Sequence, residues 1–175
     1  MPKVNQISPP LGVDSATDAI DAPATKATDA VHADYLGNNA SNDFPGPFTN
    51  PDVSRNATVT FEGGWTGGNV TVAGLDQFGA AVSEIFVSNP GTTVVGVKVF
   101  AVVSAATKGA VGVAKKARIG TGDKLGLSSR LGVPCGSLAV DAVNEVGAWD
   151  STYHAVAPTT PPNGARVFSA FYPVA

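Results

Sequence analysis

The chain has 175 residues, of which 43% are apolar and 14% are charged, and its formal net charge is −3. The apolar share is enough to build a buried core, while the low charge, the 20 glycines and the 13 prolines favour short strands and turns over helical bundles. The single cysteine, Cys135, excludes an intrachain disulfide, and we interpret it as a small buried residue in a protein made in a reducing cytoplasm.

The first 55 residues differ in composition from the rest of the chain. They contain seven of the 13 prolines, and up to Asp52 they contain seven aspartates against two lysines. We predict an extended, mostly irregular N-terminal arm over residues 1–55, with one short helix over residues 24–36 as an open alternative. A segment so poor in apolar residues cannot offset its own ordering entropy, so an ordered arm must lie on another surface.

From residue 56 onward, apolar and polar side chains alternate with a period of two, which is typical of β-strands. Strands are predicted over residues 57–61, 69–75, 80–88, 97–106, 116–120, 137–143 and 166–172. Turns are predicted at residues 76–79, 89–91 and 162–164. The almost continuously apolar segment 97–106 indicates a central strand buried on both faces. The chain is therefore predicted to be all-β, with a jelly-roll-like β-sandwich over residues 56–175.

The residues that enzymes and metal sites require do not form a recognisable pattern. His32 and His154 are the two histidines, and no serine lies in a Gly-x-Ser-x-Gly turn that could pair with either. Neither Cys-x-x-Cys nor His-Glu-x-x-His spacing occurs, and the glycine-rich segment 120–124 does not complete a phosphate-binding loop. We therefore interpret the histidines as surface or packing residues and predict no catalysis, no metal and no cofactor.

Basic residues concentrate in one part of the sequence. They are Lys108, Lys115, Lys116, Arg118, Lys124 and Arg130. A surface that binds nucleic acid would interleave aromatic side chains for base stacking, and this run has none. We expect a solvated loop or a contact with an acidic neighbour, and neither a nucleic acid nor a membrane as partner.

Four blocks of the sequence resemble a known family. Residues 49–59 are similar to an "NPDVPRN" segment, residues 68–84 to a "DVTVTGTDQFGAAVTE" hairpin, residues 94–100 to a "GTKAF" strand, and residues 119–127 to a "GTGDKLGLP" segment, with Ser128 where proline is usual. In this order the blocks resemble small virion structural proteins of tailed phages, among them capsid decoration, or cement, proteins.

The resemblance implies a place in the phage particle. We expect a decoration protein on the capsid exterior, synthesised in the host cytoplasm, with the major capsid protein and copies of itself as partners. A homotrimer at capsid threefold positions is the expected assembly. The motif residues are expected to carry turn chemistry: Gly79 at a turn exit, Gly122 with positive φ and Asp123 as a turn cap.

Contacts with these partners are expected from apolar and aromatic side chains scattered through the arm and the later loops. The candidate contact residues are Ile7, Leu11, Ile20, Tyr35, Phe44, Phe48, Trp65, Trp149 and Tyr153. On an extended arm, such anchors would each fill a shallow pocket of a partner, and deletion of residues 1–48 would leave a folded body. Two alternatives remain open: a tail, baseplate or head-fibre component, and a glycan-binding module or hydrolase fragment that uses exposed tryptophans.

Overall fold

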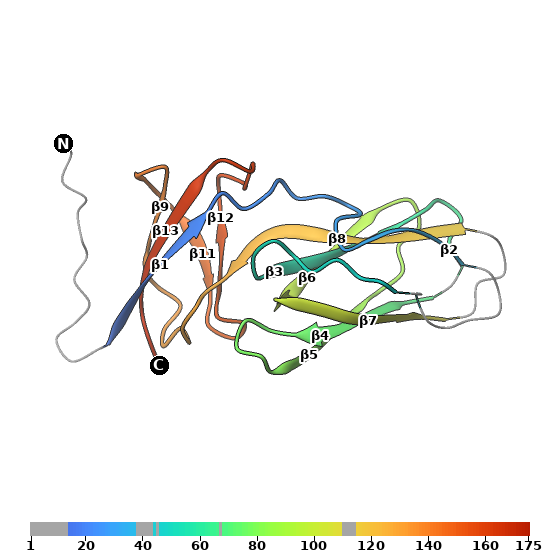
Figure 1. Ribbon diagram of the computed structural model, residues 1–175, viewed down its shortest axis with the longest axis horizontal. Coiled ribbons are helices and arrows are strands. Elements are labelled where there is room, and N and C mark those ends of the chain that lie inside the picture. Colours follow the sequence, from blue (N-terminus) through green and yellow to red (C-terminus); the bar gives the residue numbers. More distant parts are fainter. Residues whose placement is uncertain (1–13, 38–43, 45, 67, 110–114) are drawn as a thin grey trace. The chain divides into compact units, whose positions relative to one another are not determined.

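The structure, a computed structural model, describes residues 14–37, 44, 46–66, 68–109 and 115–175. Within these residues every regular element is a β-strand, so the all-β prediction is confirmed (Figure 1). The strands are β1 (Ser15–Asp21), β2 (His32–Gly37), β3 (Arg55–Phe61), β4 (Val70–Leu75), β5 (Ala81–Phe86), β6 (Thr93–Phe100), β7 (Val102–Lys108), β8 (Lys115–Gly126), β9 (Ser137–Val140), β10 (Val143–Glu145), β11 (Gly147–Asp150), β12 (Ala155–Pro158) and β13 (Val167–Pro173).

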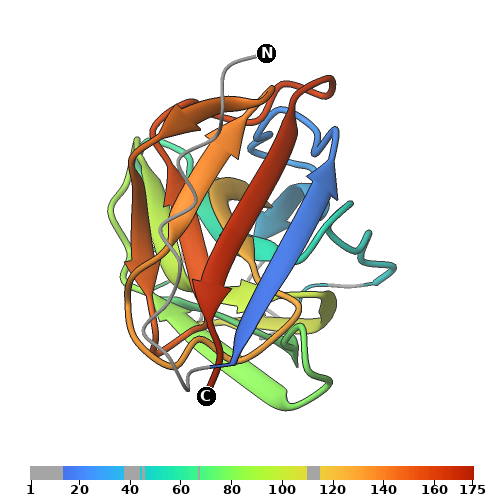
Figure 2. The ribbon, with the colours of Figure 1, turned by 90° about the vertical axis from the view of Figure 1, so that its left-hand side faces the viewer.

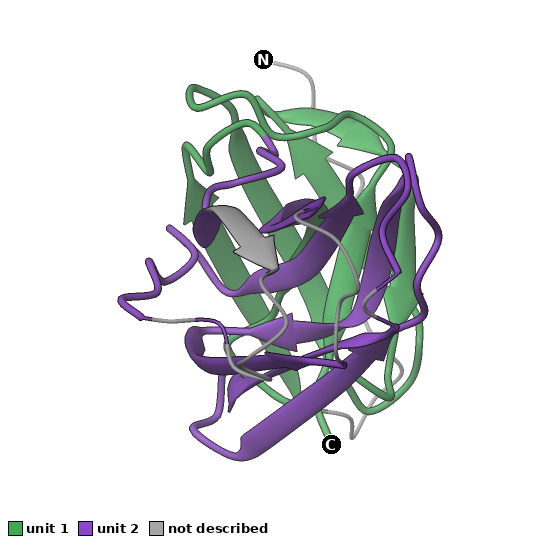
Figure 3. Ribbon diagram, turned by 90° about the vertical axis from the view of Figure 1, so that its right-hand side faces the viewer, with its two compact units in different colours: residues 1–25, 123–175 green, residues 26–122 purple. Residues whose placement is uncertain are grey.

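The chain forms two compact units (Figure 3). Unit 1 comprises residues 1–25 and 123–175, and unit 2 comprises residues 26–122. Strand β8 begins in unit 2 and ends in unit 1. This division differs from the predicted arm over residues 1–55 and sandwich over residues 56–175, because segments of the arm take part in the sheets of both units.

Unit 2 is a β-sandwich. One sheet contains β2, the first part of β8, β3 and β6, and the other has the order β5-β4-β7. Alternate side chains point inward, so Val70 and Val72 of β4 are buried while Thr71 and Ala73 between them are half-buried. The inward faces meet in one core, which contains the fully buried side chains of Phe61, Phe86, Phe100 and Ile119. Burial of such side chains contributes about 1.5–3 kcal/mol each.

Unit 1 is built in the same way from shorter strands. Its four-stranded sheet has the order β1-β13-β9-β10, and β11 and β12 extend the sheet that contains β8, in the order β11-β12-β8. Leu125 and Gly126 of β8 pair there with Val156 and Ala155 of β12. The unit has its own core, which contains Leu127, Leu131, Leu138, Val156, Ala170 and Tyr172.

Two segments of the predicted arm are strands. Figure 2 shows β1, in blue, alongside β13, in red, with paired residues from Ser15 and Pro173 to Asp21 and Val167. In unit 2, β2 pairs with β8, and the alternative helix over residues 24–36 is wrong because residues 28–30 form a turn that leads into β2. The arm thus orders on sheet edges of its own chain, which supply the backbone hydrogen bonds that its sequence cannot supply alone.

A buried polar cluster joins β1 to the rest of unit 1. Asp18 is 8% exposed, and its carboxylate accepts hydrogen bonds from the backbone N–H of Ser128 at 2.7 Å, from the Ser128 hydroxyl and from the Tyr172 hydroxyl at 2.7 Å. The Tyr172 oxygen in turn accepts the N–H of Ser129 at 3.1 Å. Burial, together with the hydrogen bond to Asp18, raises the pKa of the Tyr172 hydroxyl. We refer to Asp18, Ser128 and Tyr172 as the β1 clasp.

The predicted central strand over residues 97–106 is wrong. The chain divides at Ala101 into β6 and β7, which belong to different sheets. The N–H of Ala101 donates to the carbonyl of Leu75 at 2.9 Å, and Val97 is 48% exposed instead of buried. A continuous apolar run does not reveal such a crossing, because both halves place alternate residues in the same core.

The predicted turns are confirmed at residues 76–79, 89–91 and 162–164. Gly79 has φ +77° and donates its N–H to the carbonyl of Asp76 at 3.1 Å, as the type I turn with aspartate first and glycine fourth requires. Gly91 and Gly164 also have positive φ, at +80° and +82°.

The predicted turn roles of Gly122 and Asp123 are wrong, because both residues lie inside β8. Gly122 is not among the residues with positive φ. Glycine is needed there for space, since a Cβ would lie 2.4 Å from the side-chain oxygen of Asn56. The Asn56 amide donates to the carbonyl of Gly96 at 2.8 Å, and Arg55 Nε donates to the carbonyl of Gly122 at 2.7 Å.

Candidate partner-binding surfaces

The histidines have packing roles in the structure. His154 Nδ1 accepts the N–H of Leu131 at 3.0 Å, so this ring holds the loop after β8. His32 packs edge-on against Phe44 and tilted against Phe48, with ring centroids 5.6 and 5.3 Å apart. Within the described residues, no three His, Cys, Asp or Glu side chains gather as they would around a metal ion.

Cys135 does not lie where the sequence placed it. It is exposed, in the loop between Leu131 and β9, and its backbone N–H donates to the carbonyl of Val133 at 2.7 Å. The interpretation as a buried residue is therefore wrong. Small apolar residues are often buried, but Cys135 lies in a connecting loop, and such loops run over the protein surface.

The basic run does not form one surface. Lys108 is buried, and burial lowers the pKa of its amine. Lys115 lies 3.9 Å from the carboxylate of Glu62 at an exposed position. In unit 1, Lys124 donates to Asp150 at 2.9 Å, with both side chains largely buried.

The carboxylate of Asp150 is held by several hydrogen bonds within unit 1. Burial pushes its pKa up, but the Lys124 hydrogen bond and the backbone N–H groups of Tyr153 and Thr152 outweigh burial, and the net pKa lies below its ordinary value. The same ammonium lies 5.7 Å from the centre of the Tyr153 ring. Lys124 and Asp150 therefore stabilise the β11–β12 hairpin and are not available as a charged docking site.

Two of the predicted contact aromatics are buried, which corrects their assignment to a partner surface. Phe44 is 4% exposed and Trp65 is 3% exposed, both in the core of unit 2. Trp65 packs against Phe61 at 5.7 Å between ring centres, and its indole N–H donates to the carbonyl of Gly68 at 2.9 Å. A glycine-flanked tryptophan suggests exposure, but here the loop folds back to cover the ring.

The remaining candidates divide into three groups. Ile7 and Leu11 lie outside the described residues, as does the side chain of Tyr35. Ile20 is half-buried in β1, and Phe48 is half-buried against the core of unit 2. Trp149 and Tyr153 are also half-buried, and Trp149 packs against Tyr172 with ring centres 6.0 Å apart.

A different surface, on β5 and β6 of unit 2, carries the exposed apolar side chains. Ile85, Val87, Val95 and Val97 are 63%, 66%, 62% and 48% exposed. β5 and β6 belong to different sheets of the sandwich, so these side chains lie on the outer sides of two sheets, and we call the four together the exposed β5–β6 residues. Exposed apolar side chains of this size are candidates for contact with a partner.

Glu84 of β5 joins β5 to β6 through hydrogen bonds. Its carboxylate accepts the backbone N–H groups of Val97 at 2.7 Å and Lys98 at 3.2 Å, and the Lys98 amine donates to the carbonyl of Ser83 at 2.7 Å. Gly96 makes this approach possible, because a Cβ there would lie 2.4 Å from Glu84 Oε2. The charged side chains thus bridge the strands, and the apolar ones remain outward.

The alternation of inward and outward side chains that exposes these residues is visible in the sequence, although none of them was among the predicted contacts. In Glu84-Ile85-Phe86-Val87, the inward residues are a carboxylate and a phenylalanine, and the outward ones are Ile85 and Val87. Two outward β-branched residues in a strand that already has an inward apolar residue indicate a second surface to be covered.

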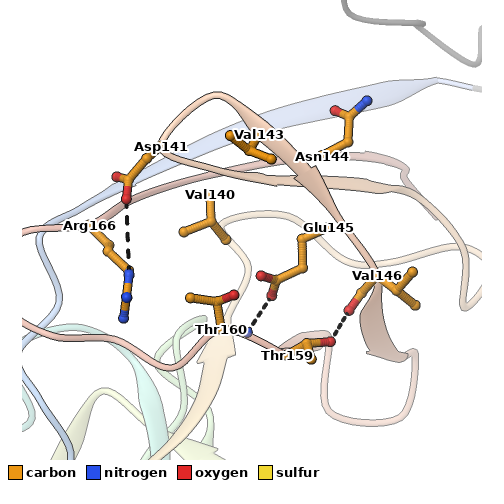
Figure 4. Close-up of a pocket in the computed structure, with 9 residues that line it drawn as sticks. All are labelled: Val140, Asp141, Val143, Asn144, Glu145, Val146, Thr159, Thr160 and Arg166. Carbon is orange, nitrogen blue, oxygen red and sulfur yellow. Dashed lines mark hydrogen bonds and ion pairs between the residues drawn. The ribbon is translucent and has the colours of Figure 1, made fainter.

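Unit 1 contains an open pocket of about 520 Å³ beneath the β9–β10 hairpin (Figure 4). It is lined by Val140, Asp141, Val143, Asn144, Glu145, Val146, Thr159, Thr160 and Arg166. Val143 and Val146 are 69% and 83% exposed. We call this site the hairpin pocket.

Polar groups in the hairpin pocket are bonded to the surrounding backbone. Glu145 accepts the N–H of Thr160 at 2.8 Å, and the Thr159 hydroxyl donates to the carbonyl of Val146 at 2.6 Å (Figure 4). Arg166 lies 4.0 Å from Asp141. The lining thus combines three valines with six polar or charged residues, and the bonds described here hold part of this polar lining in place.

No family model, curated protein or solved structure matches the chain. Among the described residues, no helix has the length and hydrophobicity to cross a membrane.

Proposed function

We propose that this chain is a structural subunit of a tailed-phage particle, a capsid decoration protein that binds the capsid exterior and reinforces contacts between major capsid protein subunits. The observation that carries the proposal is the presence of exposed apolar side chains on both units, the exposed β5–β6 residues and the valines at the rim of the hairpin pocket. Exposed apolar patches rimmed by polar residues are typical of proteins that are covered in an assembly. The four sequence blocks that resemble virion proteins supply the kind of assembly.

The test measures binding to capsids that lack their own copy of this chain. We expect saturable binding at hundreds of copies per particle and a higher melting temperature of the decorated capsid. Copies that number only tens, or that locate to the tail, would contradict the decoration role and favour a tail or fibre component. No binding to any part of the particle would overturn the structural role itself.

The arm is tested by a shorter deletion than the sequence suggested. Deletion of residues 1–48 would remove β1, β2 and the buried Phe44, so we expect it to unfold both units rather than leave a folded body. Deletion of residues 1–13 ends before β1 and removes the candidate contacts Ile7 and Leu11. If these residues bind the capsid, this variant melts like the full chain but occupies fewer capsid sites; unchanged occupancy would exclude them.

A further inference from the structure

Strand β1 forms one edge of the four-stranded sheet of unit 1, because β13 is its one neighbour among the described strands (Figure 2). It pairs with β13 over its whole length, from Ser15 to Asp21, without a register shift. We infer that the opposite edge of β1 binds an extended, positively charged segment of another protein chain, which adds to this sheet as a further strand. The inference goes beyond the proposed function and does not depend on it, because any protein with such a segment could supply the strand.

The hydrogen bonds between β1 and β13 show which backbone groups of β1 point away from the sheet. Beside the two ends of β1, the N–H of Val174 donates to the carbonyl of Asp14 at 2.8 Å, and the N–H of Ala22 donates to the carbonyl of Arg166 at 3.0 Å. Asp14 and Ala22 thus belong to hydrogen-bonded pairs. Along an antiparallel ladder such pairs alternate with pairs that are not bonded to each other, so every second residue between Asp14 and Ala22 directs its N–H and carbonyl away from β13.

Four residues of β1 have these outward backbone groups, namely Ser15, Thr17, Ala19 and Asp21. Ser15 lies opposite Pro173, which has no N–H to donate, as the alternation requires. All four residues are exposed, and within the part of the chain that the structure describes their outward groups have no hydrogen-bond partner. Each residue contributes one donor and one acceptor, so the edge offers a row of backbone groups to an incoming strand.

The other strand edges of the described sheets lack such a row. β10 and β11 have three and four residues, and β2 and β7 have register shifts in their pairing. Side chains cap β5 and β6, since Glu84 accepts the N–H groups of Val97 and Lys98. The Lys98 amine also donates to the carbonyl of Ser83. Short strands, irregular pairing and charged caps are means by which proteins prevent an added strand, whereas the outward positions of β1 carry no lysine, proline or cap.

The charge of β1 indicates the chemistry of the partner. Residues 14–25 contain Asp14, Asp18 and Asp21 and neither lysine nor arginine. Opposite charges on directly paired strands stabilise a sheet, and like charges destabilise it. Asp21 is exposed at an outward position, where a lysine or arginine of the added strand can pair with it. A second copy of β1 would bring its own three aspartates to the same edge, so the charge favours a different, basic segment.

The test measures the binding of labelled peptides to the full chain by fluorescence anisotropy. The probe is a peptide as long as β1 in which lysine alternates with valine and threonine, and both of its ends are blocked. One control peptide has glutamate in place of lysine. A second has a methyl group on every backbone nitrogen, so it keeps the charge but cannot donate the hydrogen bonds of an added strand.

Two substitutions test the edge itself. Thr17→Pro removes an outward N–H and leaves the bonds to β13 in place, and Thr17→Ala, which keeps the N–H, is its matched control. Asp21→Lys reverses the charge at the edge, and Asp29→Lys makes the same change at an exposed residue of unit 2. Melting curves check that each variant is folded.

We expect the lysine peptide to bind the wild-type chain saturably, and the methylated and glutamate peptides each to require at least a tenfold higher concentration. Thr17→Pro should weaken binding of the lysine peptide at least tenfold, while Thr17→Ala and Asp29→Lys should bind it like the wild type. Asp21→Lys should bind the lysine peptide more weakly and the glutamate peptide more tightly, because the sign of the charge at the edge is reversed.

Equal binding of the methylated peptide would show a contact of charges without strand pairing and would overturn the inference. So would a folded Thr17→Pro that binds like the wild type, or no binding of the lysine peptide at millimolar concentration. If Thr17→Pro does not fold, the comparison of the peptides decides alone. Dimers of the wild-type chain in light scattering that Thr17→Pro abolishes would show that a second copy occupies the edge, against the basic segment. These measurements use no capsids, so the proposed function is judged separately.

Discussion

The β1 clasp predicts a large effect of a single small substitution. Asp18→Ala removes the carboxylate that accepts hydrogen bonds from Ser128 and Tyr172, and Tyr172 is fully buried. Hydrogen bonds to a charged group contribute about 1.5–3 kcal/mol each, and a buried donor left without a partner costs about 1–3 kcal/mol. Removing the carboxylate also removes its own desolvation cost, which offsets part of the loss. We therefore expect a decrease of about 3 kcal/mol in the free energy of unfolding.

The measurement is thermal and urea unfolding of Asp18→Ala beside a matched control. At about 2–4 °C per kcal/mol for a chain of this size, the melting temperature should fall by roughly 6–12 °C. Asp21→Ala, at the exposed end of the same strand, should stay within about 0.5 kcal/mol of the wild type. Asp18→Ala with the stability of the Asp21→Ala control would show that backbone pairing alone holds β1, and the clasp argument would fail.

Three further predictions concern pH and close packing. Burial raises the pKa of Asp150, but the hydrogen bonds from Lys124, Tyr153 and Thr152 outweigh it and lower that pKa, so the contribution of Asp150 to stability is present above the ordinary carboxyl pKa near 4 and is lost as the pH falls below it; Asp150→Asn should make the free energy of unfolding in urea less dependent on pH below about pH 4, and an unchanged dependence would contradict this. Burial raises the pKa of Tyr172, so its contribution is present below about pH 10 and is lost as pH rises further; Tyr172→Phe should reduce the alkaline loss of stability, and an unchanged slope would contradict this. Gly122→Ala should destabilise unit 2 by about 2 kcal/mol, because its Cβ would displace Asn56; wild-type melting would contradict the contact.

Turns and strands were predictable where a residue type strongly favours one backbone conformation. Aspartate and glycine at a four-residue spacing predicted the turn at Gly79, and period-two alternation predicted β3, β4 and β5 to within two residues at each end. Both signals come from residues close together in the sequence. The pairing of β1 with β13 gives no such signal, because Asp21 and Val167 are brought together only by the fold.

Which side chains are exposed was also not predictable from the sequence alone. Aromatic side chains in glycine-rich or proline-rich segments were expected at the surface, and Trp65 and Phe44 are instead core residues. The type of a side chain states how much area it can bury, but only the fold decides which surface buries it. Ile85 and Val97 are instead the exposed residues, and their sequence context predicts strands without stating which side of each strand is covered.

Four sequence blocks, residues 49–59, 68–84, 94–100 and 119–127, contribute to the packing of unit 2. Asn56, from the first block, donates to the carbonyl of Gly96, from the third, and its side chain occupies the space that a Cβ on Gly122, from the fourth, would need. Glu84, from the second block, lies against Gly96 and caps the same strand. Side chains and glycines that depend on one another in this way must be retained together for the sandwich to close. A protein could therefore keep these blocks and this packing while its outward residues, such as Ile85, change.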